Sequence, residues 1–324
     1  MTALLTVENV EKRFGGGRRL FGGRKAAVHA VQGVDVVVMQ GETLGIVGES
    51  GCGKSTLARM LVGLDRPTSG AIRIEGVDPA AFARGDTRVL ARTIQYVFQD
   101  PTSSLNPRKT IRTILETPMV HLRGLDRPAR TARLEELMDA VKLSADFLDR
   151  YPHEFSGGQA QRIGIARALA AEPRLVILDE PVSALDVSVQ AQVLNLLGEL
   201  QERFALTYVF ISHDLSVVET VSDRVAVMYF GRIVECAESR ELFRAPRHPY
   251  TRLLFDAAPV PGRRSVRAEA KPAELPDPYA PPPGCAFAPR CPNVQDRCRR
   301  ERPALSADRV SATHSAACFF PVGA

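Results

Sequence analysis

Residues 43–55 read TLGIVGESGCGKS, and this stretch decides the fold. The run TLGIV is apolar and ends at a glycine, which is typical of a buried strand. GESGCGKS (48–55) then matches the phosphate-loop pattern G-x-x-x-x-G-K-[ST], and STLARMLVGL continues with apolar residues at helical spacing. A strand before the loop and a helix after it are the context that the pattern requires. We therefore favour a nucleotide-phosphate loop over a glycine-rich turn with an accidental lysine.

The residue types of this loop suit the binding of a magnesium nucleotide. Its glycines let the backbone curl so that N–H groups face phosphate oxygens. Lys54 is expected to neutralise the β- and γ-phosphates, the Ser55 hydroxyl to bind Mg²⁺, and Thr56 to give a further phosphate contact. The predicted nucleotide-binding residues of the loop are Gly48, Glu49, Ser50, Gly51, Cys52, Gly53, Lys54, Ser55 and Thr56.

The body of the chain alternates apolar runs with helical stretches, as α/β proteins do. RLVILDE (174–180) and TYVFIS (207–212) are predicted strands, and RVAVMYFGRIVE (224–235) is a predicted hairpin that turns at Gly231. Residues 108–150 contain helical patterns with no strand between them, which predicts an all-helical insertion. From about residue 256 the sequence is rich in Pro and Arg and is expected to be dominated by loops.

Four polar residues follow predicted strands and are candidates for the chemistry. Asp179 can anchor Mg²⁺, and Glu180 can polarise an attacking water, although adjacent carboxylates are also common at solvated strand ends. Gln99 follows TIQYVF and His213 follows TYVFIS, so both are candidates for contact with the γ-phosphate. Taken alone, Gln99 fits a sheet-edge residue and His213 a helix-capping histidine equally well.

A second anion-binding pattern lies at residues 154–170, EFSGGQAQRIGIARALA. Ser156, Gly157 and Gly158 form a small, permissive turn before an amphipathic run, and a helix N-terminus offers unpaired N–H groups and a positive dipole end. This stretch has no lysine of its own, unlike the first loop. A tight glycine turn that opens a helix is the alternative interpretation.

Together these residues resemble the ATP-binding cassette (ABC) ATPase family over nearly the whole body. FSGGQ (155–159) is similar to its signature motif, ILDE to its Walker B segment, and SALD (183–186) to its D-loop. The resemblance implies a P-loop (RecA-like) α/β core, an N-terminal antiparallel β part, a helical subdomain at about 101–165 and a loop-rich, Cys-containing extension. We expect a cassette at 1–257 and the extension at 258–324.

The resemblance also implies a division of labour between two chains. In this family two cassettes pack head to tail, so Ser156, Gly157, Gly158, Gln159 and Asp186 would contact ATP held by the partner. Glu180, His213 and Gln99 would be catalytic, and Ser55, Gln99 and Asp179 would hold Mg²⁺. An aromatic residue would stack on adenine, with Phe14 as the candidate and Phe21 as the alternative.

Two further segments narrow the resemblance. QDPTSSLNPR (99–108) and RHPYTRLLFDAAP (247–259) are similar to the ATPases of oligopeptide and dipeptide importers. That group implies a second ABC ATPase subunit, identical or related, two integral-membrane permeases and an extracytoplasmic peptide-binding protein. Nickel or another small solute remains an alternative cargo, because an ATPase subunit does not touch cargo.

The C-terminal region contains Cys285, Cys291, Cys298 and Cys318. Four thiolates suit tetrahedral zinc or an iron–sulfur cluster, and unliganded thiols are a third possibility. Disulfides are not expected in a cytosolic protein. The peptide-importer ATPases carry a similar motif, and the resemblance implies a [4Fe–4S] cluster there. Cys236 is expected to be structural.

Composition limits the remaining function classes. No apolar run reaches about 18 residues and the N-terminus lacks a secretory pattern, so we expect a peripheral protein on the cytoplasmic face of the membrane. The net charge is +5, and residues 261–324 carry ten Lys or Arg against six Asp or Glu. This basic tail keeps a DNA- or ribosome-acting ABC ATPase as the rival, yet such proteins carry paired cassettes, coiled coils or zinc insertions that this chain lacks. No nucleic-acid partner is therefore expected.

Overall fold

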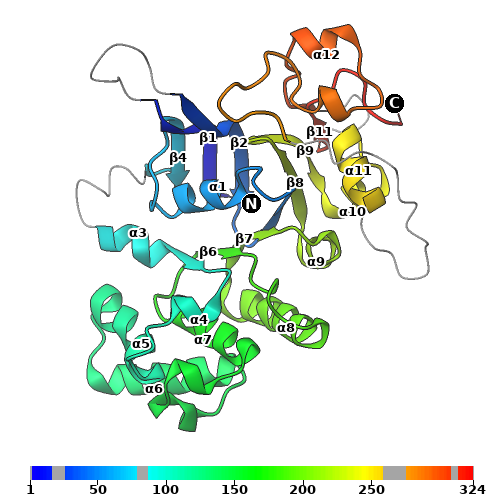
Figure 1. Ribbon diagram of the computed structural model, residues 1–324. Coiled ribbons are helices and arrows are strands. Elements are labelled where there is room, and N and C mark those ends of the chain that lie inside the picture. Colours follow the sequence, from blue (N-terminus) through cyan, green and yellow to red (C-terminus); the bar gives the residue numbers. More distant parts are fainter. Residues whose placement is uncertain (1, 17–25, 79–86, 258–274, 308–312, 324) are drawn as a thin grey trace.

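The computed structural model describes residues 2–16, 26–78, 87–257, 275–307 and 313–323, and it confirms the α/β class (Figure 1). An eight-stranded sheet has the order β10-β11-β9-β8-β3-β7-β6-β5, and a three-stranded sheet has the order β2-β1-β4. Strands β8, β3, β7, β6 and β5 are parallel, whereas β9, β11 and β10 continue the sheet in antiparallel fashion. The small sheet is antiparallel throughout, as expected for the N-terminal part.

The elements follow one another in the order of Figure 1. The strands are β1 (Ala3–Gly15), β2 (Ala27–Met39), β3 (Thr43–Val47), β4 (Ser69–Ile74), β5 (Ile94–Val97), β6 (Leu175–Asp179), β7 (Thr207–Ser212), β8 (Arg224–Tyr229), β9 (Arg232–Glu238), β10 (Ser306–Ala307) and β11 (Ser315–Ala316). The helices are α1 (Lys54–Leu61), α3 (Thr87–Thr93), α4 (Pro101–Ser104), α5 (Ile111–Pro118), α6 (Arg127–Ala140), α7 (Gly157–Leu169), α8 (Val187–Phe204), α9 (Leu215–Val221), α10 (Ser239–Arg244), α11 (Pro249–Ala257) and α12 (Asp296–Arg300). Short helical turns are η1 (Met119–Arg123), η2 (Ala145–Asp149), η3 (Pro152–Glu154) and η4 (Ala288–Arg290).

The polar residues that follow the central strands lie at one edge of the sheet. Every residue of β3, β6 and β7 is buried, which fits parallel strands that are covered on both faces. Val47 pairs with Ser212, and Asp179 pairs with Ile211. At this edge lie the phosphate loop, Asp179 with Glu180, and His213. Ligands of α/β folds bind at the same place, outside the carboxyl ends of the strands.

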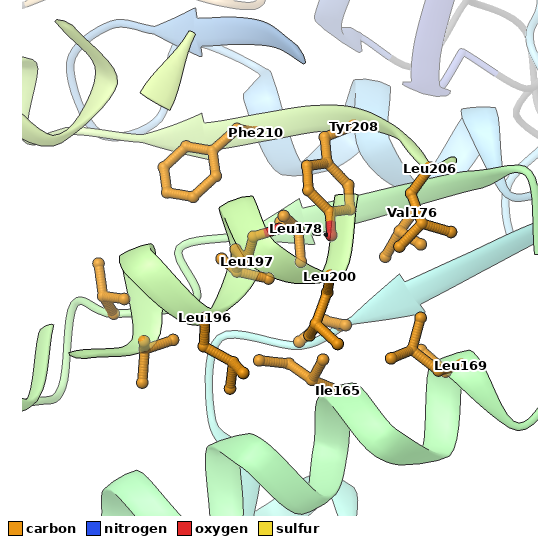
Figure 2. Packing of buried hydrophobic residues seen from close by; sticks show 14 of the residues in the cluster. Ile165, Leu169, Val176, Leu178, Leu196, Leu197, Leu200, Leu206, Tyr208 and Phe210 are labelled. Atoms are coloured by element: carbon orange, nitrogen blue, oxygen red, sulfur yellow. Dashed lines mark hydrogen bonds between the residues drawn. The ribbon is translucent and has the colours of Figure 1, made fainter. Parts of the chain in front are cut away.

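The predicted all-helical insertion is present between β5 and β6. It contains α4 to α7 and, in Figure 1, lies to one side of the sheet. Its last helix, α7, is fixed to the core through α8. Figure 2 shows Ile165 and Leu169 of α7 packed with leucines of α8 and with side chains of β6 and β7. This buried cluster connects the glycine turn before α7 to the strand that carries Asp179.

The C-terminal extension is joined to the main sheet. Strand β11 pairs with β9, with Ser315 opposite Cys236 and Ala316 opposite Glu235. Glu235 is fully buried, and its carboxylate accepts hydrogen bonds from the backbone N–H groups of Arg247 and His248 and pairs with His314 Nε2 at 2.7 Å. Within the described ranges, every helix is too short or too polar to span a bilayer.

Candidate active site

The phosphate loop has the backbone shape that its glycines predict. Gly48, Gly51 and Gly53 have φ values of 156°, 78° and 108°, which residues with a Cβ rarely adopt. A Cβ on Gly48 would lie 2.1 Å from the carbonyl oxygen of Met228, so the loop also packs too closely on β8 to admit a side chain there. Helix α1 begins directly after Gly53 and turns its N-terminus toward the loop.

Lys54 is buried at the centre of the loop. Its ammonium donates to the backbone carbonyls of Gly48, at 2.7 Å, and Glu49, at 3.0 Å. It also lies 3.8 Å from the Sγ of Cys52, a thiol whose pKa is raised by burial. The carbonyl oxygens of the loop thus hold the Lys54 ammonium in position, and phosphate oxygens could take their place as acceptors.

The magnesium candidates Asp179 and Ser55 are in contact. The Ser55 hydroxyl donates to Asp179 Oδ1 at 3.3 Å, and the phenol of Tyr96 donates to Asp179 Oδ2 at 2.5 Å. Burial raises the pKa of Asp179, while the hydrogen bonds from Tyr96 and Ser55 oppose that rise. A buried carboxylate beside a serine hydroxyl is an oxygen donor set that suits Mg²⁺.

Glu180, Gln99 and His213 converge on one carboxylate oxygen. Gln99 Nε2 donates to Glu180 Oε2 at 3.0 Å, and His213 Nδ1 lies 3.2 Å from the same oxygen. Glu180 has φ 49°, a strained conformation for a residue with a Cβ, and its N–H bonds to the Ile211 carbonyl at 2.8 Å. Such strain is common where a side chain must be aimed at a reaction centre.

Lys54, Ser55, Gln99, Glu180 and His213 line a single cavity of about 560 Å³, which is large enough for a nucleotide, whereas Asp179 does not line it. The loop contributes Ser50, Gly51, Gly53, Lys54, Ser55 and Thr56, and the far wall contributes Gln99, Glu180 and His213. Val28, His29 and Ala30 of β2, Phe230 and Gly231 of the β8–β9 turn, and Pro278 of the extension complete it. Gly48, Glu49 and Cys52 shape the loop without lining this cavity.

Phe14, the adenine candidate, is on β1 beside the cavity. Phe14 pairs across the sheet with Val28, which lines the cavity. The residue is 42% exposed, and the Lys12 ammonium lies 4.9 Å from the centre of its ring. The ring itself does not line the cavity. Phe21 lies outside the described residues, so the aromatic contact to adenine stays a prediction.

The signature residues do not face the cavity of their own chain. Ser156 caps α7 and forms a capping box with Gln159: the serine Oγ accepts from Gln159 N, and the glutamine Oε1 accepts from Ser156 N. Gly158 packs on α8, where an added Cβ would meet Val189 Cγ1 at 2.4 Å. Asp186 caps α8, and the Ser188 hydroxyl bond is the main cause that lowers its pKa.

Comparison with known proteins identifies the family of this arrangement. The model of the ABC transporter family matches residues 31–183, and the probable peptide ABC transporter ATP-binding protein y4tS of Sinorhizobium fredii is 51% identical over 94% of this chain and 86% of its own length. The chain belongs to the ABC transporter ATPase family. As such an ATPase it uses ATP and Mg²⁺, and the residues around Lys54 and Asp179 fit both.

Other relatives and solved structures agree with this assignment. The oligopeptide transport ATP-binding protein AppF of Bacillus subtilis is 49% identical over 97% of this ABC ATPase and 96% of its own length. The model of the oligopeptide/dipeptide transporter C-terminal region matches residues 234–298. CbiO1 of Clostridium perfringens is similar with a TM-score of 0.65, 28% identity and coverage of 75% and 92%. The ATP-binding cassette MJ0796, in a dimer bound to ADP and Pi, is similar with a TM-score of 0.62, 29% identity and coverage of 73% and 99%.

The four C-terminal cysteines come together around one small cavity. Cys285, Cys291, Cys298 and Cys318 all line it, next to His248 and Phe287. Burial raises the pKa of Cys285, of Cys291 and, to about 11, of Cys318. Among the described residues, no group of three or more His, Cys, Asp or Glu is placed to hold a metal ion. Cys236 is buried and free, beside Arg224.

Sequence reasoning missed several residues of the site. His29 and Pro278 line the cavity and are joined by a backbone hydrogen bond of 3.0 Å. Tyr96, on β5, holds Asp179, and its only sequence signal is a polar hydroxyl within an apolar run. Arg290 contacts the phosphate loop across 241 positions of sequence, and no local pattern points to it.

Proposed function

We propose that this ATPase powers the import of dipeptides or oligopeptides through two partner permeases. The observation that carries the proposal is the match of residues 234–298 to the oligopeptide/dipeptide transporter C-terminal region, which lies beyond residues 31–183, the range matched by the general ABC transporter model. The curated relatives AppF of Bacillus subtilis and OppF of Salmonella typhimurium are both named oligopeptide transport ATP-binding proteins. The chain would act peripherally on the cytoplasmic face of the membrane, without a nucleic-acid partner.

The assembly proposed for this activity is a dimer of ATPase subunits below the permeases. The second subunit is another copy or a related ABC ATPase, and an extracytoplasmic peptide-binding protein delivers cargo to the permeases. Within the chain we propose a cassette at 1–257, with its helical subdomain at about 101–165, and an extension at 258–324. The dimeric cassettes among the similar structures support the two-subunit arrangement.

Residues of both subunits share the work in the proposed mechanism. Lys54 and the loop N–H groups bind the phosphates, and Ser55, Asp179 and Gln99 hold Mg²⁺, which balances phosphate charge. Glu180 takes a proton from the attacking water, while Gln99 and His213 orient its carboxylate through their contacts with Oε2. Ser156, Gly157, Gly158, Gln159 and Asp186 meet the partner's ATP, in keeping with their positions away from this chain's own cavity.

For the cysteines we propose a [4Fe–4S] cluster held by Cys285, Cys291, Cys298 and Cys318. Four cysteines that line one cavity supply the Cys₄ ligand set of such a cluster, and the same set is the alternative ligand set for zinc. When bound, the cluster would cross-link the loops of the extension. Iron and acid-labile sulfide in anaerobically purified protein test this proposal; protein that holds only zinc, or no metal, contradicts it.

Co-purification and uptake together test the transport proposal. Affinity-tagged chain is purified from detergent-solubilised membranes, and labelled dipeptide uptake is measured in cells that carry either wild-type chain or Lys54→Ala. We expect two permease subunits in the purified complex and uptake only with the wild type. Recovery with ribosomes or DNA, or uptake of nickel instead of peptide, contradicts the proposal.

A further inference from the structure

The C-terminal extension makes a direct contact with the phosphate loop at Glu49. Arg290, the last residue of η4, donates Nη1 to Glu49 Oε2 and Nη2 to Glu49 Oε1, both at 2.7 Å. The two side chains are 14% and 28% exposed, so this forked pair is largely shielded from water. Tyr250 of α11, which is fully buried, accepts the Glu49 N–H on its hydroxyl at 2.9 Å.

Glu49 is therefore bound through every polar group that it has. Its carbonyl accepts from the Lys54 ammonium, its N–H is bound by Tyr250, and its carboxylate is bound by Arg290. The residue follows Gly48, whose conformation few other residues can adopt. A displacement of Glu49 would consequently move a carbonyl that holds the lysine of the ATP site.

The Arg290 pair also has an electrostatic effect on the loop. Glu49 brings a negative charge next to a loop that must bind the phosphates of ATP, and like charges repel at short range. The bidentate contact neutralises that carboxylate and raises the pKa of Arg290 well above its usual value. The Arg290 guanidinium is in turn held near the rings of Tyr229 and Phe287, with centroid distances of 5.8 and 5.7 Å.

We propose that Arg290 and Tyr250 are positioning residues for the phosphate loop, which fix Glu49 and neutralise its charge so that ATP can bind. The same segments line the four-cysteine cavity: Cys291 directly follows Arg290, and His248 and Pro249 directly precede Tyr250. The extension thus takes part in building the ATP site of its own chain. This inference rests on the ATP-binding activity and is independent of the cargo.

Because Arg290 neutralises Glu49, substitution of Arg290 should raise the KM for MgATP more than substitution of Glu49. Arg290→Gln leaves an unpaired carboxylate on the phosphate loop, whereas Glu49→Gln removes that carboxylate. We expect Arg290→Gln to raise the KM for MgATP about tenfold, within the range of coupling measured for contacting residues, with kcat within twofold of wild type. Glu49→Gln should raise KM less than threefold. Adding Glu49→Gln to Arg290→Gln should restore most of the lost affinity.

The experiment uses the full-length chain and measures MgATP turnover, binding of a fluorescent ATP analogue and thermal melting. Arg300→Gln, an exposed arginine of the same extension, is the matched control and should behave as wild type. Arg290→Lys keeps the charge but loses the fork, and Tyr250→Phe removes only the acceptor for the Glu49 N–H; each should raise KM severalfold. If both are folded yet have wild-type KM, the proposal is overturned.

The double variant distinguishes an effect of the Glu49 charge on ATP binding from a contribution of the Arg290–Glu49 pair to folding alone. If Arg290→Gln/Glu49→Gln binds ATP no better than Arg290→Gln, the charge of Glu49 is irrelevant and the proposal is wrong. If the single variants lower kcat and melting temperature while KM is constant, the contact stabilises the fold alone and the proposal is again overturned. Peptide uptake is not among these readouts, so failure here is distinguishable from failure of the transport proposal.

Discussion

The Tyr96→Phe substitution removes one hydrogen bond from Asp179, the proposed magnesium ligand, and tests how the pKa of its carboxyl is set. Asp179 is 5% exposed, and burial raises the pKa of its carboxyl. The 2.5 Å bond from the Tyr96 hydroxyl and the 3.3 Å bond from the Ser55 hydroxyl both favour the carboxylate and oppose that rise. Without the phenol, the pKa of Asp179 must rise further.

The size of the shift follows from the strength of the lost bond. A hydrogen bond to a charged group contributes about 1.5–3 kcal/mol, so the loss of the Tyr96 bond destabilises the carboxylate relative to the neutral acid and raises the pKa of Asp179. Mg²⁺ binds the carboxylate and not the neutral acid. A higher pKa therefore removes the competent form as pH falls, and the acid limb of kcat/KM for MgATP moves to higher pH than in the wild type.

The assay is steady-state kcat/KM from about pH 5 to pH 9, with Tyr208→Phe as the control. Tyr208 also loses a buried hydroxyl bond, to the Leu197 carbonyl at 3.1 Å, but it faces no carboxylate. The control should lower stability and leave the pH profile in place. Parallel profiles for Tyr96→Phe and wild type, or an equal displacement in Tyr208→Phe, would refute the role given to the phenol.

Three further substitutions probe the rest of the site. Glu180→Gln should reduce turnover by about 10²–10⁴ and accumulate an ATP-bound dimer, as measured by single-turnover kinetics and size-exclusion chromatography; unchanged turnover removes Glu180 from its catalytic role. Gly158→Ala places a Cβ 2.4 Å from Val189 Cγ1, so ATP-driven dimerisation should be lost while the monomer still binds ATP, and adding Val189→Ala should restore it; a failure of that rescue contradicts the packing argument. Gly48→Ala places a Cβ 2.1 Å from the Met228 carbonyl oxygen and should abolish ATP binding, whereas Gly198→Ala, with open space around it, should not; equal ATP affinity for both would show that the loop adapts.

The parts that the sequence predicted correctly depend on short stretches of chain. The strand, loop and helix around Lys54 are contiguous, so apolar patterning and glycine spacing were enough to predict them. The absence of strands between β5 and β6 marked the helical insertion, and Gly231, with φ 78°, closes the predicted β8–β9 hairpin. The carboxyl ends of parallel strands meet at one edge, which is why residues that follow different strands, such as Asp179 and His213, lie near one another; their catalytic roles stay predictions.

The contacts that sequence reasoning missed join segments that are far apart in the chain. Arg290 and Glu49 are 241 positions apart, and Gln32 and Phe230, whose carbonyl accepts the glutamine amide, are 198 apart. Nothing in the local pattern around Arg290 differs from the other basic residues of the extension. Such pairs become visible only when the fold has fixed which surfaces meet. The roles of Phe14 and of the four cysteines stay predictions for a different reason, because each role is defined by contact with a ligand.

The capping box at Ser156 explains how a helix start without a lysine can complete a phosphate site. Helix geometry leaves the first N–H groups without partners inside the helix. In α7, the serine and Gln159 side chains satisfy the N–H groups of Ser156 and Gln159, the two at either end of the turn. Those of Gly157 and Gly158 lie between them, on residues with no side chain to block an anion. Such a site offers dipoles and hydrogen bonds but no net charge, so a polyphosphate would bind it weakly alone. A lysine that already binds the phosphates would strengthen it, and Lys54 lies in a cavity that the signature residues of the same chain do not line. In the ATPase dimer proposed above, each subunit would place its α7 N-terminus beside the Lys54 site of the other subunit, so that each ATP is bound from both sides.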